Sequence, residues 1–119
     1  MFSSFNCFLK GQGQGYGPSL GLHCDQGAVP LPWGDIALNC NCTWALTDYT
    51  LEDGSLACVP RSHELHSHPT PDAPSQAIPV ECKRGSLIVF GGQLWHGAFP
   101  KQTPGLRIAL ITYFRHSVR

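Results

Sequence analysis

Apolar and polar residues alternate regularly between residues 36 and 47. A period of two is typical of a β-strand whose two faces lie in different environments. The apolar positions are Ile36, Leu38, Cys40, Cys42, Trp44 and Leu46, and the polar positions include Asn39, Asn41, Thr43 and Thr47. We therefore expect a strand that buries its apolar face, with Cys40 and Cys42 as small core residues.

Short strand-like segments separated by turn signals continue along the rest of the chain. Glu52-Asp53-Gly54 and Lys83-Arg84-Gly85 are turn sequences, and Gly91-Gly92 interrupts another segment. The further segments of strand-like composition are 55–59, 79–82, 86–90, 94–96 and 106–115. Six or seven strands without a helix favour an all-β sandwich or jelly roll.

Glycine and proline divide the chain into these short pieces. There are 13 glycines and 10 prolines among 119 residues, a density that leaves few windows for a helix. We interpret residues 1–17 as a flexible, glycine-rich lead-in and residues 18–119 as one folded domain. Residues 60–79 hold half of the prolines together with His63, His66 and His68. They predict a long loop, which we interpret as a solvated lid rather than a second metal site.

Charge and cysteine content exclude several classes of function. Eight Lys and Arg balance eight Asp and Glu, so the chain offers no excess of basic charge for nucleic acid or anionic lipid. No apolar run approaches the roughly 18 residues of a membrane span, and the N-terminus lacks the features of a signal peptide. We expect a cytoplasmic protein whose six cysteines are reduced and mostly buried.

Three residues form a candidate metal site. His23 and Asp25 are two positions apart, so in an extended segment both side chains point to the same face. His96, in a short predicted strand, is the third candidate. Two imidazoles and one carboxylate are the ligand set that leaves open positions on non-haem Fe(II).

Arg107 is a candidate for anion binding because its neighbours in sequence are apolar. A guanidinium keeps its charge, so an arginine within an apolar strand usually has a carboxylate or phosphate partner. That partner could be an internal acidic residue or an exogenous dicarboxylate. The alternative is an edge-strand arginine that reaches solvent.

Seven short motifs follow one another in an order that resembles the phytanoyl-CoA dioxygenase family of Fe(II)/2-oxoglutarate oxygenases. They are His23-x-Asp25, 44–48, 52–56, 59–63, 85–90, 94–97 and Arg107. The resemblance covers roughly residues 18–115. It implies a double-stranded β-helix, a cupin-like jelly roll. We expect this fold to be incomplete on its N-terminal side, because members of the family usually have more chain before the His-x-Asp segment.

The resemblance also implies a function. His23, Asp25 and His96 would bind Fe(II), and Arg107 would bind the distal carboxylate of 2-oxoglutarate. With O2, this site would hydroxylate a small organic substrate while 2-oxoglutarate is decarboxylated to succinate and CO2. The alternatives are a truncated, non-catalytic or merely metal-binding jelly roll, and a cupin-like isomerase that uses no 2-oxoglutarate.

Two departures from the family pattern bear on the structure. Arg61 stands where the family usually has glycine, so we expect a backbone conformation there that is costly for a residue with a side chain. Ala98 stands where some members have a serine that helps to hold 2-oxoglutarate. An incomplete sheet would also expose a strand edge, and we expect a homodimer that covers it.

Overall fold

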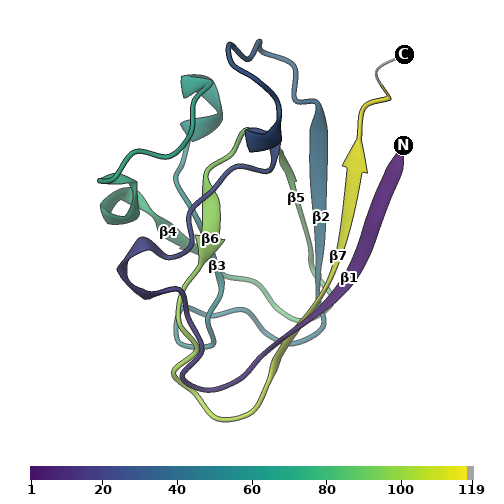
Figure 1. The fold of residues 1–119 in the computed structure, drawn as a ribbon. Coiled ribbons are helices and arrows are strands. Elements are labelled where there is room, and N and C mark those ends of the chain that lie inside the picture. Colours follow the sequence, from purple (N-terminus) through teal and green to yellow (C-terminus); the bar gives the residue numbers. More distant parts are fainter. Residues whose placement is uncertain (118–119) are drawn as a thin grey trace.

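The computed structural model describes residues 1–117, which form two antiparallel sheets that face each other (Figure 1). The larger sheet has the strand order β1-β7-β2-β5, formed by Phe2–Lys10, Arg107–Arg115, Asn39–Ala45 and Leu87–Gly91. The smaller sheet has the order β4-β3-β6, formed by Ile78–Val80, Leu56–Cys58 and His96–Ala98. The short 3-10 helices of this region are η1 (Gly17–Ser19), η2 (Asp25–Ala28), η3 (Ser62–Leu65) and η4 (Ala73–Gln76). The predicted all-β jelly roll is confirmed.

None of the helices within residues 1–117 is long and apolar enough to cross a membrane. All six cysteines are unpaired, as predicted, but the expectation that most of them are buried is wrong. Cys24 alone is buried, Cys7 is exposed and the other four are partly exposed.

The N-terminal segment differs from the prediction. Residues 1–17 do not form a flexible lead-in, because β1 pairs along its length with β7, from Phe2 opposite Phe114 to Lys10 opposite Arg107. The two strands lie side by side at the edge of the molecule (Figure 1). Only residues 4–7 alternate between polar and apolar, and the glycine run that begins at Gly11 masks this short pattern. The larger sheet thereby gains an N-terminal strand.

Strand β2 forms where predicted, but its faces are reversed. Asn41 and Thr43 are 8% and 2% exposed and point between the sheets, whereas Trp44 is 44% exposed on the outer side. Cys40 and Cys42 share the outer side with Trp44 and are not core residues. Alternation shows that a strand has two faces, but it does not show which face meets the interior. Here the interior holds a polar site, so the polar face is buried.

Residues 60–79 are largely exposed, as a solvated loop should be, but two buried side chains, Ser62 and Ala73, anchor them to the core. The indole of Trp95 is buried and donates a hydrogen bond of 2.7 Å to the carbonyl oxygen of Ser67, and the buried Ser62 hydroxyl accepts one of 2.8 Å from the Trp95 backbone. Ala73 of η4 belongs to the same core cluster as Trp95. Nε2 of His66 also lies 3.3 Å from Oδ1 of the exposed Asp35, so the segment is attached to the rest of the domain at several points.

The backbone at Arg61 has the conformation that the missing glycine predicts. Its φ of 64° and ψ of 6° lie in the left-handed region, which is costly for a residue with a Cβ. The Arg61 side chain forms an ion pair with the exposed Glu64, with 2.9 Å between Nη2 and Oε2. An exposed pair of this kind contributes little stability.

We expect Arg61→Gly to raise the free energy of unfolding by about 0.5–1 kcal/mol, because it relieves a left-handed backbone and loses a weak ion pair. Chemical denaturation measures this change. The matched control is Arg84→Gly, which lies in a turn whose left-handed position is already occupied by Gly85 and which should not gain stability. A less stable Arg61→Gly variant would contradict the assignment.

The outer face of the larger sheet is apolar and exposed. Phe5, Leu9, Trp44, Val89 and Phe114 are between 38 and 60% exposed, and they alternate with residues that line the space between the sheets. From Phe5 onward, the outward positions of the four strands carry no charged side chain. Such a face is self-complementary, since two copies can meet without burying a charge.

The homodimer stays a prediction, and the structure indicates this face as its contact surface. We expect the 119-residue chain to self-associate in sedimentation experiments and Val89→Glu to shift it towards monomer, because the variant would bury an unpaired charge. Leu65→Glu is the control, since Leu65 is equally exposed but lies on η3. A native chain that sediments as a single monomer and melts cooperatively would contradict the prediction.

Candidate functional site

Backbone pairing places His23 beside His96. The two residues form an isolated antiparallel bridge in which each N–H donates to the other's carbonyl oxygen at 2.9 Å. Gly97 makes this approach possible, because a Cβ at that position would overlap the carbonyl oxygen of Leu20. The imidazole rings then lie 4.4 Å apart, centre to centre.

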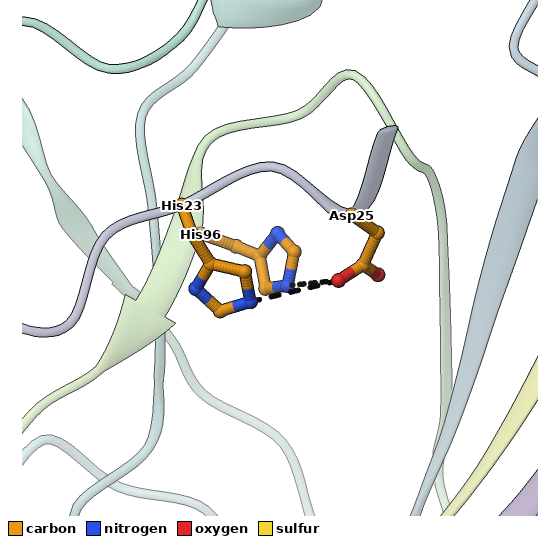
Figure 2. Close-up of side chains that lie close together, drawn as sticks. All are labelled: His23, Asp25 and His96. Atoms are coloured by element: carbon orange, nitrogen blue, oxygen red, sulfur yellow. Dashed lines mark ion pairs between the residues drawn. The ribbon is translucent and has the colours of Figure 1, made fainter. Parts of the chain in front are cut away.

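Asp25 completes the cluster from the first residue of η2. Its Oδ1 atom lies 3.5 Å from Nε2 of His23 and 3.5 Å from Nε2 of His96. Figure 2 shows the three side chains converging on one point. Their ligand atoms all lie within 4.8 Å of one another, and no other group of three or more such side chains occurs in residues 1–117. The structure thus brings together the three residues singled out as metal ligands, and His63, His66 and His68 form no second cluster.

Backbone carbonyls orient both imidazoles. Nδ1 of His23 lies 2.8 Å from the Gly21 carbonyl oxygen, and Nδ1 of His96 lies 2.9 Å from that of Leu94. A carbonyl oxygen only accepts hydrogen bonds, so each Nδ1 carries a proton and each Nε2 faces the cluster, where it offers a lone pair when the imidazole is neutral. This is the arrangement found around histidines that bind metals.

The buried polar face of β2 orients the carboxylate. Asn41 donates from Nδ2 to Oδ2 of Asp25 at 3.3 Å, and Thr43 donates its hydroxyl to Oδ1 of Asn41 at 2.8 Å. Neither Asn41 nor Thr43 was among the predicted site residues. The regular polar positions of this strand carry the signal, but they predict a solvent-exposed face equally well.

The pKa shifts of the cluster differ between the two imidazoles. The hydrogen bond to Asp25 raises the pKa of His23 against the opposing effect of burial. Burial lowers the pKa of His96, and this outweighs the nearby carboxylate. Burial alone would raise the pKa of Asp25, but the hydrogen bond from His23 and the charge of His96 hold it below its ordinary value. At neutral pH Asp25 is therefore ionised and His96 neutral, the protonation states that bind metal ions, whereas at His23 a metal ion competes with a proton.

The cluster opens into a cavity of about 560 Å³ between the two sheets, which Arg107 also lines. Tyr49, Leu56, Phe90 and Ile111 supply much of the apolar wall. The ring of Phe90 packs against His96, with 4.6 Å between their centres. Ala98 lines the same cavity.

Arg107 is buried in this cavity rather than directed to solvent. It is 9% exposed, and β7 is an inner strand of its sheet, so the edge-strand interpretation is wrong. Nη1 donates to the carbonyl oxygen of Gly54 at 2.7 Å, and the guanidinium lies 4.8 Å above the ring of Tyr49. Nε is buried without a partner, and no carboxylate of residues 1–117 forms an ion pair with Arg107. An internal acidic partner is therefore excluded within this part of the chain.

A jelly roll with a two-histidine, one-carboxylate cluster points to the class of non-haem iron oxygenases. The family model described as phytanoyl-CoA dioxygenase (PhyH) matches residues 3–109, and the chain belongs to this family.

Curated relatives match part of the chain. The dioxygenase af480 of Aspergillus fumigatus is 38% identical over 81 residues, which cover 66% of this chain and 26% of that protein. The dioxygenase trt7 of Aspergillus terreus is 38% identical over 77 residues, covering 64% of this chain and 27% of that protein. The chain thus spans about a quarter of the length of these curated relatives.

Solved structures share the fold. The crystal structure of EvdMO1 is 26% identical and covers 99% of this chain and 28% of its own, with a TM-score of 0.79. SnoK, a non-heme alpha-ketoglutarate-dependent carbocyclase from nogalamycin biosynthesis, is 19% identical and covers 97% of this chain and 49% of its own, with a TM-score of 0.73. Another structure of this fold, EvdO2, was solved in complex with 2-oxoglutarate.

We expect His96→Ala to weaken binding of Mn²⁺ strongly, because it removes one of three ligands. Asn41→Ala should weaken it by roughly 10-fold or more, because it releases the Asp25 carboxylate. Calorimetric titration measures both affinities. His116→Ala is the control, since His116 lies outside the cluster. Equal Mn²⁺ affinity in the native chain and His96→Ala would contradict the assignment.

Proposed function

We propose that this chain forms the core of an Fe(II)/2-oxoglutarate-dependent dioxygenase that hydroxylates a small organic substrate, with decarboxylation of 2-oxoglutarate to succinate and CO2. One observation carries the proposal: the His23, Asp25 and His96 cluster and the unpaired Arg107 line the same cavity. A metal site and an anion site in one cavity suit a co-substrate with a chelating keto acid at one end and a carboxylate at the other.

The donor set fits iron. Two imidazole nitrogens and one carboxylate oxygen, all facing a common point, leave other coordination positions open towards the cavity. His23, Asp25 and His96 would hold the ion. Bound Fe(II) supplies the activation of O2 coupled to oxidation of the keto acid, and the protein supplies binding and orientation.

Arg107 fits the distal carboxylate of 2-oxoglutarate. A guanidinium binds a carboxylate through two parallel hydrogen bonds, and Arg107 uses Nη1 for Gly54 while Nε has no partner. The Gly54 carbonyl and the Tyr49 ring hold the guanidinium plane in place before a ligand arrives. Little ordering is therefore needed on binding.

Apolar walls shield part of the site from water, chiefly around the buried His96, while the His23 side chain is 57% exposed. Phe90 covers one side of His96, while Leu56 and Ile111 add aliphatic surface. Exclusion of water strengthens the charge interactions inside and limits side reactions of the oxidant. A small organic molecule is the substrate that suits a cavity of this size.

Proteins of this fold catalyse different oxidations: SnoK is described as a carbocyclase and SnoN as an epimerase. For this chain we propose hydroxylation. A non-catalytic jelly roll that binds a metal ion but no 2-oxoglutarate is the second candidate. A cytoplasmic location and the absence of a nucleic-acid partner stay predictions.

We expect anaerobic titration of the Fe(II)-loaded chain with 2-oxoglutarate to produce the weak visible charge-transfer band of an iron-chelated keto acid. Arg107→Ala should raise the 2-oxoglutarate concentration needed by roughly 100-fold, because it removes a bidentate, charge-assisted pair. Arg84→Ala is the matched control, since Arg84 lies in an exposed turn.

Succinate release on admission of O2 then tests turnover. If iron binds and no band appears, the metal-binding jelly roll replaces the oxygenase. If iron does not bind, the assignment of the three ligands is wrong.

A further inference from the structure

We propose that Lys10 is a second anchor, beside Arg107, for the distal carboxylate of the co-substrate. The inference rests on the proposed function and extends it to a residue on β1, the strand that stands in place of the predicted flexible lead-in. It follows from the placement of two buried cations, neither of which has an acidic partner within residues 1–117.

The register of the larger sheet puts the two cations side by side. Lys10 of β1 lies directly opposite Arg107 of β7, so their side chains leave the sheet on the same face as neighbours. Both are buried, at 6% and 9% exposed. The Lys10 ammonium donates to the carbonyl oxygen of Phe99 and lies 5.5 Å from the centre of the Tyr16 ring.

No carboxylate balances this pair of charges. Within residues 1–117 neither Lys10 nor Arg107 forms an ion pair, and their hydrogen-bond partners are the neutral carbonyls of Phe99 and Gly54. The nearby Asp53 is already bound to Lys101, at 3.4 Å. Burying two like charges together is costly unless an anion compensates them.

The pKa of Lys10 reflects the same excess of positive charge. Burial, followed by the positive charge of Arg107, lowers the pKa of Lys10 to about 8. A carboxylate placed between the two cations would favour the charged form of both. Within residues 1–117 of the free protein, the positive charges of Lys10 and Arg107 therefore have no carboxylate beside them.

The cavities show where that group can lie. Lys10 lines a second cavity of about 330 Å³, and Phe8, Tyr16 and Arg107 line both this cavity and the one that contains the metal cluster. Arg107 thus stands at the junction of the two spaces. An ammonium has three donors, and Lys10 uses one for Phe99. It keeps donors for a carboxylate held by Arg107 at this junction.

Calorimetry with two matched ligands tests the inference. The chain loaded with redox-inert Mn²⁺ is titrated with 2-oxoglutarate and with 2-oxopentanoate, in which a methyl group replaces the distal carboxylate. We expect Lys10→Met to weaken 2-oxoglutarate binding roughly 10-fold or more and to leave 2-oxopentanoate binding unchanged. Lys83→Met, at an exposed lysine paired with Asp48, should change neither.

Two further variants separate charge from packing. Lys10→Gln keeps a donor for the Phe99 carbonyl but loses the charge, so it should behave like Lys10→Met. Lys10→Arg keeps the charge and should retain most of the affinity. Without ligand, the melting temperature of Lys10→Met should equal or exceed that of the native chain, because a buried like-charge contact is removed.

The failure of this inference can be told apart from the failure of the proposed function. If Arg107→Met loses 2-oxoglutarate binding while Lys10→Met retains it, the role of Lys10 is overturned and the oxygenase stands. Equal loss of both ligands in Lys10→Met, or unfolding of both neutral variants, would make Lys10 a structural residue and also overturn it. A native chain that binds Mn²⁺ but not 2-oxoglutarate would overturn both proposals.

Discussion

The backbone bridge between His23 and His96 is the contact on which the site depends. Two hydrogen bonds of 2.9 Å join a segment near the start of the chain to β6, more than seventy residues later. Both metal-ligand candidates are the bridging residues themselves, so the same bonds that close the smaller sheet also set the distance between the imidazoles. Asp25 needs only the two following residues of extended chain to reach them. The geometry of the cluster is therefore a property of the backbone, and the side chains need little adjustment.

Much of the site could be predicted from the sequence because its residues differ in type from what their sequence neighbours lead one to expect. A histidine two residues from an aspartate is a weak signal alone, but His96 completes a ligand set typical of non-haem Fe(II), and Arg107 is a charged residue in an apolar strand. The strands at 39–45 and 107–115 were predictable for a similar reason, since long periodic segments carry the strongest signal.

The parts that could not be predicted depend on long-range partners. Strand β1 is short and precedes a glycine run, and it is specified by the free edge of β7, which lies about a hundred residues away in sequence. Asn41 and Lys10 are polar residues whose burial follows from the strand on the other side of the cavity. Periodicity contains neither the identity of that partner nor the side of the strand that it covers. For the same reason, the sequence pattern did not show that the apolar side chains of the larger sheet lie on its outer, exposed face.

The reversed faces of β2 have a consequence for folding specificity. This strand is paired on both sides, with β5 and β7. A slip of one residue would move Trp44 into the space between the sheets and carry Asn41 and Thr43 out to the surface. Such a register would place an indole in a cavity that holds ionised Asp25 and strip that carboxylate of its amide donor. The polar residues that serve the site thus also discriminate against misregistered sheets, so loss of Asn41 would cost pairing fidelity as well as chemistry.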